Sequence, residues 1–418
     1  MSQAPTKIVV IGGGLGGAKT AEALREQGYT ASITVISNEA DPPYERPPLS
    51  KGYLAGHVPF EEALVHPLTW YAEHDVDLRL STSATGFNTD RHTVTLSDGS
   101  TLGYDKLVLA TGAIPRVLAV PGADAANVLH LRRHGDADTI RATFGNGRRL
   151  VIIGAGWIGL EVAAAARGEN AAVTIVEMAE LPLLGVLGPE IAHVIADLHA
   201  AHGVRLCLGA RLVEITVDQG GRASGVRLAD GTLIAADAVV VGVGVTPDIA
   251  LAEAAGLATD NGVLVDASLR TSDPDVYAVG DIANQAHPTL GTRVRVEHWA
   301  TALKQPATAA AAMLDAGGSE TAYSELPYFF SDQYDLGLEY LGYTSRDANY
   351  RVIVRGNLAS REFVAFWVDS SNRIKAAMNV NVWDVIDAVK PLIIAETVVE
   401  PTRLSDPDIA YSELAARP

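Results

Sequence analysis

Apolar runs and glycine-rich turns alternate along the first part of the chain. The run Lys7–Ile11 leads into a glycine-rich turn, a helical stretch at 18–26 that stops near Gly28, and a second apolar run at 33–36. A continuous apolar run is typical of a parallel strand buried on both faces, and glycine is common just past the end of a helix. The pattern therefore predicts a strand–helix–strand unit.

The same pattern begins again in the middle of the chain. A strand is predicted at 150–153, a helix at 159–167 after another glycine-rich turn, and a further strand at 172–176. In each half, an alternating segment around Asp-Gly follows, and then another apolar strand, at 106–109 and within 237–247. This shared order indicates an internal repeat at the scale of a domain.

The last part of the chain changes character. Strand-like sequence returns at 262–283, an alanine-rich helix is expected at about 298–315, and aromatic residues gather at 328–334. The elements expected beyond these are those of a small α+β domain. They are three strands, at 350–355, 362–368 and 374–382, a helix near 383–394 and a surface coil after Pro401.

These patterns predict an α/β fold with two Rossmann-like dinucleotide-binding domains and a small C-terminal α+β domain. We place the first dinucleotide-binding domain at residues 1–117 and 247–324, and the second at 118–246. The C-terminal domain is placed at 325–418.

The composition is that of an ordinary globular protein, with 48% hydrophobic and 20% charged residues among 418. A formal net charge of −18 argues against nucleic acid and anionic membranes as partners. No apolar run approaches the roughly 18 residues of a membrane-spanning helix, and no export signal is visible. With one cysteine, Cys207, an internal disulfide is excluded. A cytoplasmic location is therefore expected.

Two glycine-rich turns carry the most specific chemistry. Each fits G-x-G-x-x-G between a strand and a helix, at Gly12–Gly17 and Gly154–Gly159. Such glycines let the backbone turn tightly and approach a pyrophosphate, whose charge lies at the positive end of the helix. Two such turns in one chain suggest two dinucleotides, and the simplest interpretation is a flavin and a nicotinamide that exchange a hydride.

Several common chemistries are missing. Cys207 lies in a predicted strand and is expected to be a core residue. The chain has no Cys-x-x-Cys motif, no metal-ligand spacing among its 11 histidines and no iron–sulfur pattern. No metal site is therefore expected, and the protein should pass electrons to a separate carrier.

Five further segments make a resemblance specific. Together with the two glycine turns, the chain resembles the FAD-dependent NADH:ferredoxin reductases of bacterial oxygenase systems, relatives of putidaredoxin reductase, rubredoxin reductase and apoptosis-inducing factor, from about residue 7 to about 395. The segments are Leu109–Gly112, Thr271–Asp281, Pro43–Lys51, Val296–Trp299 and Pro327–Tyr334.

The resemblance implies a glutathione-reductase-like pair of domains, the first for FAD and the second for NADH. It also implies a flavoprotein that passes electrons from NADH through FAD to a ferredoxin, most simply a [2Fe–2S] protein that serves an oxygenase. Two alternatives stay open. One is a reductase of rubredoxin or of a small quinone or radical acceptor, and the other is a flavin-containing protein that senses NADH.

The residues expected to bind the two cofactors follow from the glycine turns and the resemblance. They are Gly12, Gly14, Leu15, Gly17, Glu39, Arg46, Lys51, Ala84, Ala110, Thr111, Gly112, Arg132, Gly154, Gly156, Ile158, Gly159, Glu161, Glu177, Gly244, Asp281, Glu297, His298 and Trp299.

Two acidic residues are assigned to the flavin. An acid near the end of the second strand should hold the adenosine ribose. Because many relatives have an acid where Asn38 stands, Glu39 is the candidate, and whether Asn38 or Glu39 holds the ribose is not decided by the sequence. Asp281 is expected at a strand-to-helix turn and, by the resemblance, on the ribityl chain. A helix entering soon after would direct its positive end at the flavin ring.

Lys51, Glu161 and Trp299 are the expected catalytic residues. Ser50 resembles a helix N-cap after Pro-Pro, which would put Lys51 in a first helical turn, where a cation opposes the helix dipole. The resemblance pairs Lys51 with Glu161 near flavin N5, so the pair is expected to orient the nicotinamide.

Glu177 is expected to select NADH. It ends the second strand of the second unit, where a carboxylate accepts hydrogen bonds from the ribose hydroxyls and repels a 2′-phosphate. The next cation along the chain is Arg205, and Glu180 adds repulsion. A preference for NADH over NADPH of at least tenfold follows.

Other features are not decided by the sequence. The aromatic residues Tyr328 and Phe330 stand where relatives usually carry tryptophan, so a packing role and a role at the flavin edge both remain open. Arg293, Arg295 and Lys304 are candidate docking cations or ordinary surface charges. The identity of the ferredoxin, the terminal oxygenase and the oligomeric state cannot be read from the sequence.

Overall fold

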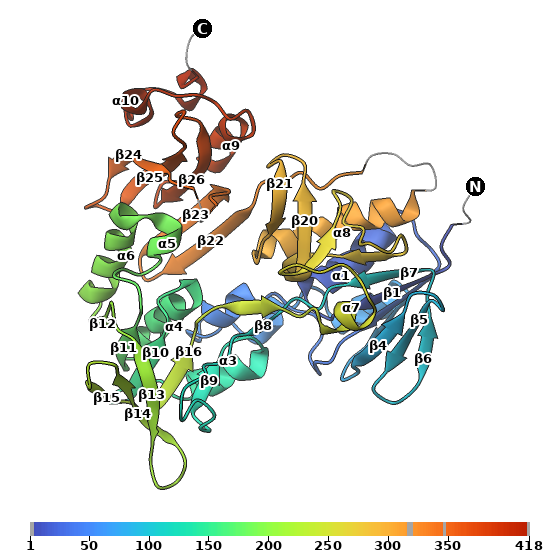
Figure 1. Ribbon diagram of the computed structural model, residues 1–418, viewed down its shortest axis with the longest axis horizontal. Coiled ribbons are helices and arrows are strands. Elements are labelled where there is room, and N and C mark those ends of the chain that lie inside the picture. The colour runs from blue at the N-terminus through green and yellow to red at the C-terminus, as the bar shows by residue number, and fades with distance from the viewer. Residues whose placement is uncertain (1–3, 316–320, 346–347, 416–418) are drawn as a thin grey trace. The chain divides into compact units, whose positions relative to one another are not determined.

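The computed structural model describes residues 4–315, 321–345 and 348–415 (Figure 1). Contacts divide the chain into two compact units. The first is Met1–Arg46, Glu61–Ile114 and Thr246–Pro327, and the second is Pro47–Phe60, Pro115–Val245 and Tyr328–Pro418. The segment around Lys51, which we placed in the first dinucleotide-binding domain, thus groups with the second unit. The predicted three-domain boundaries stay a prediction.

A five-stranded parallel sheet forms the core of the first unit. Its strand order is β19-β7-β1-β2-β3, and β1 pairs with β2 from Lys7↔Ser32 to Ile11↔Ile36. The β-branched runs of β1 and β2 are almost wholly buried, as expected of central parallel strands. The bounds are β1 Lys7–Ile11, β2 Ser32–Ile36, β3 Val76–Arg79, β7 Lys106–Leu109 and β19 Val276–Ala278.

Two small sheets and four helices complete the first unit. The antiparallel sheet β4-β5-β6 is formed by Ala84–Asn88, Thr93–Leu96 and Thr101–Gly103, and the sheet β18-β20-β21 by Val263–Val265, Ala283–His287 and Thr292–Arg295. The helices are α1 Leu15–Glu26, α2 Leu68–Glu73, α7 Ala250–Ala254 and α8 Trp299–Leu314.

The second unit repeats this plan. Its parallel sheet has the order β12-β11-β10-β16-β9, and a glycine-rich turn again joins the central strand β10 to a helix, α4. An antiparallel sheet β13-β14-β15 corresponds to β4-β5-β6. The strands are β9 Val128–His130, β10 Arg149–Ile153, β11 Ala172–Val176, β12 Arg205–Cys207, β13 Leu212–Val217, β14 Ala223–Leu228, β15 Leu233–Ala235 and β16 Ala238–Val241. The predicted internal repeat is therefore present.

Four helices belong to this repeat, and two short strands lie where the chain passes between the units. The helices are α3 His134–Arg141, α4 Trp157–Gly168, α5 Leu184–Leu187 and α6 Pro189–Ala201, and the short strands are β8 Ala113–Pro115 and β17 Val245–Pro247, which pair. Cys207 is partly exposed and packs against a core cluster of this unit.

The C-terminal part of the second unit is a five-stranded antiparallel sheet of order β22-β23-β26-β25-β24. Its strands are β22 Tyr328–Gln333, β23 Leu336–Gly342, β24 Arg351–Asn357, β25 Glu362–Val368 and β26 Ile374–Val380, and helix α9 spans Ile386–Ile394. The three predicted strands are present, but β22 and β23 were missed. The expected coil after Pro401 is wrong, because α10 (Pro401–Leu404) forms there and Leu404 and Leu414 are fully buried.

Helix α6 buries an ionisable group. His199 is 0% exposed, and burial lowers the pKa of its imidazole to about 4, a nearby His202 lowering it too, against the opposing effect of a hydrogen bond to Gln333. A histidine held neutral in the fold takes up a proton more readily when the chain is unfolded.

Stability should therefore fall as the pH is lowered from about 6.5 towards 4. The unfolded chain binds the extra proton in that window, at a cost to the fold of about 1.4 kcal/mol for each pH unit. Urea unfolding at pH 7 and pH 5 should show a smaller pH effect in His199→Phe than in the wild type. His202→Phe serves as the matched control and should change the pH dependence less than His199→Phe does, because burial, and not His202, is the largest cause of the lowered His199 pKa. An unchanged pH dependence in His199→Phe would contradict the assignment.

Candidate functional site

The first glycine turn joins β1 to α1, and the three glycines at its G-x-G-x-x-G positions, Gly12, Gly14 and Gly17, have two different roles. Gly12 has φ +125°, and a Cβ there would overlap the Ala110 carbonyl oxygen. A Cβ on Gly17 would overlap the Gly12 carbonyl oxygen, whereas a Cβ on Gly14 would have nothing within 4 Å. The outer glycines are therefore required by the chain's own packing, and the middle one borders open space.

The second turn, between β10 and α4, has the same geometry. A Cβ on Gly154 would overlap the Gly242 carbonyl oxygen, and one on Gly159 that of Gly154, but Gly156 has only Gly242 oxygen at 4.0 Å. The N-caps of α1 and α4, Gly14 and Gly156, make no side-chain capping bond. The first-turn amides thus have no side-chain cap, as a pyrophosphate site requires. Both turns fit a dinucleotide.

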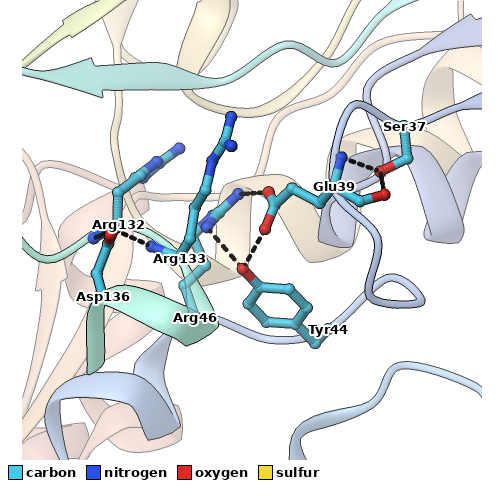
Figure 2. A network of polar contacts seen from close by, with 7 residues as sticks. All are labelled: Ser37, Glu39, Tyr44, Arg46, Arg132, Arg133 and Asp136. Atoms are coloured by element: carbon cyan, nitrogen blue, oxygen red, sulfur yellow. Dashed lines mark hydrogen bonds and ion pairs between the residues drawn. The ribbon is translucent and has the colours of Figure 1, made fainter. Parts of the chain in front are cut away.

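Glu39 lies in a polar cluster of the first unit (Figure 2). Its carboxylate accepts hydrogen bonds from the Tyr44 hydroxyl at 2.5 Å and from the Arg46 guanidinium at 3.0 Å. Burial lowers the pKa of Arg46, but Tyr44, Glu39 and Asp281 together raise it above its ordinary value. The cluster thus brings three of the predicted flavin-site residues into one electrostatic environment, while the ribose contact of Glu39 stays a prediction.

No α-helix begins directly after Asp281, although the helix expected at about 298–315 is present as α8, Trp299–Leu314. Asp281 lies in a 3-10 turn, Gly280–Ile282, and strands β20 and β21 follow before α8 begins at Trp299. The turn is held from both directions, because Gln305 of α8 accepts a hydrogen bond from the Gly280 amide and Arg295 donates to the Asp281 carbonyl. Asp281 thus lies in a short 3-10 turn after β19 and not at the start of an α-helix, and α8 contacts this turn through Gln305.

The residues at the start of α8 make contacts within the first unit. His298 is the N-cap of α8, and Glu297 pairs with Arg295 at 2.6 Å. Burial raises the pKa of the Glu45 carboxyl, a hydrogen bond with Trp299 opposing the effect. The partly buried Trp299 indole therefore lies near the Glu45 carboxyl.

Two of the three candidate docking cations are structural. Arg293 donates to the carbonyl oxygens of Val265 and Asn284, and Arg295 is occupied by Asp281 and Glu297. The Lys304 side chain is 48% exposed, with Glu325 at 3.8 Å.

The local structure of Lys51 differs from the prediction. A 3-10 helix spans Pro47–Ser50, and the Lys51 amide donates to the Pro48 carbonyl at 3.1 Å. Ser50 is thus the end of a short helix and not an N-cap, so the argument from an opposed helix dipole was wrong. Proline, which fixes φ, is the residue that starts this turn.

The Lys51–Glu161 pair is nevertheless present, in the second unit. Lys51 Nζ lies 2.5 Å from Glu161 Oε1, and Glu161 is 3% exposed. The hydroxyls of Ser50 and Ser331 donate to the same carboxylate at 2.5 and 2.6 Å. A buried ion pair is tolerated when its remaining polar capacity is satisfied, and three donors here satisfy the Glu161 carboxylate.

An aromatic ring and a second carboxyl complete this cluster. Lys51 Nζ lies 5.2 Å from the centroid of the Phe330 ring, within range of a cation–π interaction. Burial raises the pKa of Asp332, as does Glu161, while Lys51 lowers it. Strand β22 therefore supplies three successive residues to the surroundings of Lys51. Sequence reasoning treated this strand as an aromatic block and missed Ser331 and Asp332.

Glu177 is directed at the second glycine turn. Its carboxylate accepts hydrogen bonds from the Ala155 amide at 2.7 Å and from the Ala179 amide at 2.9 Å. The adjacent Met178 is 71% exposed. The acid therefore borders the predicted pyrophosphate site, and its own contact with a ribose stays a prediction.

The remaining predicted residues lie near the turns or at strand ends. Leu15 and Ile158 are in the first turns of α1 and α4, Ala84 begins β4, and Ala110, Thr111 and Gly112 follow β7, where the Thr111 hydroxyl donates to the Asp248 carbonyl. The Arg132 amide donates to Asp136, as does that of Arg133 (Figure 2). The Gly244 carbonyl accepts from the Arg116 amide.

Two glycine turns, each at the end of the central strand of a parallel sheet, define a protein that holds two dinucleotides. Residues 6–306 match the family model described as pyridine nucleotide-disulphide oxidoreductase, and residues 328–415 match the one described as reductase C-terminal. The chain belongs to this family of oxidoreductases and, as the resemblance indicated, to its ferredoxin–NAD(+) reductases.

The similarity extends over nearly the whole chain. It is 40% identical to the anthranilate 1,2-dioxygenase system ferredoxin–NAD(+) reductase component of Burkholderia cepacia, over 96% of this chain and 97% of that relative. It is 35% identical to the rubredoxin-NAD(+) reductase of Pseudomonas putida over 80% of this chain and 86% of that one. The crystal structure of the covalent putidaredoxin reductase–putidaredoxin complex matches with a TM-score of 0.93 and 36% identity, covering 99% and 98% of the two chains.

The described residues form no helix with the length and apolar character of a membrane span, and they contain no group of three or more His, Cys, Asp or Glu side chains that could hold a metal ion.

The geometry of the first glycine turn predicts different effects for two alanine substitutions. Gly17→Ala should lower the thermal stability of the protein, because its Cβ overlaps the Gly12 carbonyl oxygen. Gly14→Ala should leave the fold intact and lower the FAD content, because its Cβ fills the space left for the cofactor. Melting temperatures and flavin absorbance of the purified variants test the contrast. Equal effects on both quantities in both variants would contradict it.

Proposed function

We propose that this chain is an FAD-containing, NADH-dependent ferredoxin reductase that supplies electrons to an oxygenase. The observation that carries the proposal is that the same glycine-turn geometry occurs in both units, together with a buried Lys51–Glu161 pair beside the second glycine turn. The names of the relatives, ferredoxin–NAD(+) reductases of oxygenase systems, support the same function.

The first unit would hold FAD. Gly14 leaves the space for the pyrophosphate, and the cluster of Glu39, Arg46 and Asp281 supplies charged groups of both signs for the ribose and ribityl hydroxyls. When bound, FAD would supply the conversion between hydride transfer from NADH and single-electron transfer to the acceptor. This chemistry suits a protein whose single cysteine excludes the dithiol route used by disulfide reductases.

The second unit would hold NADH and position its nicotinamide. Gly156 leaves the corresponding space, and the Lys51 ammonium is held in place by Glu161 and the Phe330 ring. A cation kept at one position in a largely desolvated cluster stabilises negative charge as it develops on a neighbouring group. Lys51 and Glu161 therefore orient the nicotinamide. Trp299 is assigned to the lining of the flavin site.

The electron acceptor is a separate iron–sulfur protein, because the sequence of this chain has no pattern of ligands for an iron–sulfur cluster of its own. The partners of the chain are ferredoxin and NADH, and neither nucleic acid nor a membrane is among them. We place the protein in the cytoplasm, which its single cysteine and its use of NADH support.

Glu177 should make NADH the preferred reductant by at least tenfold in kcat/KM, about 1.4 kcal/mol. The carboxylate beside the second glycine turn repels a 2′-phosphate. Steady-state rates with NADH and NADPH should show this ratio in the wild type and a smaller one in Glu177→Gln. The matched variant Glu180→Gln should retain most of the preference. Equal use of the two cofactors by the wild type would contradict the assignment.

The choice of acceptor is tested by comparing carriers at equal NADH. A [2Fe–2S] ferredoxin should be reduced at least tenfold faster than rubredoxin or a small quinone. Faster reduction of rubredoxin or the quinone would contradict the ferredoxin assignment and favour the alternative reductase. Slow reduction of every carrier, with NADH-dependent association of the chain, would favour the NADH-sensing alternative.

A further inference from the structure

A chain of buried polar groups leads from Glu161 to helix α6. It passes through Ser331 and Gln333 of β22 and ends at His199, and these three side chains are 1%, 1% and 0% exposed. Ser331 and Gln333 are two positions apart in a strand, so both side chains lie on the same face. Burying three polar groups in sequence is unfavourable unless each is hydrogen-bonded, and each of them is.

Every link of the chain is within hydrogen-bond distance. Ser331 Oγ lies 2.6 Å from Glu161 Oε1, and Gln333 Nε2 lies 3.1 Å from Ser331 Oγ. His199 Nε2 lies 2.8 Å from Gln333 Oε1. The path therefore runs without a gap from the imidazole to the carboxylate that binds Lys51.

The carboxylate determines the direction of all these bonds. An ionised Glu161 only accepts, so Ser331 must donate its hydroxyl proton to it. The Ser331 oxygen then accepts from the amide nitrogen of Gln333, which directs the Gln333 carbonyl at His199. The neutral imidazole must accordingly carry its proton on Nε2. One buried charge thus fixes an amide orientation and a histidine tautomer that are otherwise ambiguous.

The far end of the chain is also constrained. The Tyr334 hydroxyl lies 3.4 Å from His199 Nδ1, the acceptor nitrogen of that tautomer. Tyr334 has φ +56°, a conformation that non-glycine residues rarely adopt, and its ring stacks on His202 at 3.7 Å. Backbone strain of this kind persists where surrounding contacts outweigh it, and it gathers at functional sites.

We propose that His199 is a positioning residue for the reaction, which acts through Gln333 and Ser331 to hold the Glu161 carboxylate, and through it Lys51, in one orientation. This inference rests on the proposed function, in which Lys51 orients the nicotinamide. Without the His199 donor, Gln333 is free to turn its amide, and Ser331 can direct its hydroxyl away from Glu161. The ammonium of Lys51 would then sample several positions, and small misplacements of a reacting pair cost rate more than affinity.

The test measures the rate of flavin reduction by NADH in anaerobic stopped-flow mixing, at increasing NADH concentrations until the rate no longer rises. His199→Phe keeps the ring and removes both nitrogens, and Ser331→Ala removes a single oxygen. The saturating rate should fall about threefold or more in each variant, while the NADH concentration at half-saturation stays within twofold. Ser331→Thr, which keeps the hydroxyl, should restore most of the rate.

The matched control is His202→Phe. His202 stands three residues from His199, stacks on Tyr334 and has no hydrogen bond to Ser331, Gln333 or Glu161 among those found in the structure. This variant should have the wild-type rate. Flavin content and melting temperature are measured for each variant, so that a fold defect is recognised. If His199→Phe does not hold flavin, Ser331→Ala and Ser331→Thr decide the question.

A second set of variants carries Lys51→Met. If the chain acts through Lys51, His199→Phe and Ser331→Ala should cause no further loss in this background, because residues that act as one unit are not additive. A full additional loss in the Lys51→Met protein would overturn the inference and indicate a purely structural role. A wild-type rate in both His199→Phe and Ser331→Ala would overturn it as well. A wild-type rate in Lys51→Met alone would instead refute the proposed role of Lys51.

Discussion

The Glu161 carboxylate is the group on which the arrangement of the second unit's site depends. A charge that is only 3% exposed is costly unless it is paired and hydrogen-bonded. The donors come from two other segments: Ser50 and Lys51 from the end of the 3-10 helix Pro47–Ser50 and the residue after it, and Ser331 from β22. One buried charge on α4 therefore specifies how the Lys51 segment and the C-terminal sheet pack on the second Rossmann-like sheet, and it explains why Pro47–Phe60 groups with that unit.

The two glycine turns show how the same backbone geometry serves both folding and binding. In each turn the outer glycines are crowded by the chain's own carbonyl groups, and only the middle glycine borders open space. Packing of the outer glycines thus fixes the positions of the first amides of α1 and α4. The open space beside the middle glycine is available for a ligand. The two units differ in the residues beyond the turn, with Glu39 and Arg46 in one and Glu177 in the other, and we propose that this difference suits the first turn to a flavin and the second to a nicotinamide.

Much of the fold could be predicted because its signals are local. Apolar runs with glycine turns identified both parallel sheets, and the resemblance identified Lys51 and Glu161. The contacts of Glu161 with Ser331 could not be predicted from spacing, because they join positions 170 residues apart. Strands β20 and β21 were missed because their polar residues, such as Asn284 and Arg293, hydrogen-bond within the unit. Leu404 and Leu414 are buried by tertiary packing that the tail sequence does not indicate.

The most direct test of the account is anaerobic mixing of the purified protein with NADH alone, with the visible flavin band observed over time. The account predicts that the wild-type band bleaches within the turnover time of the enzyme, and that Glu161→Gln, which keeps the shape of the side chain and removes its charge, bleaches severalfold more slowly with the same flavin content. Bleaching at equal rates in the two proteins would contradict the central place given to this carboxylate. The absence of a flavin band, or of any bleaching, would contradict the assignment of FAD and NADH to the two glycine turns.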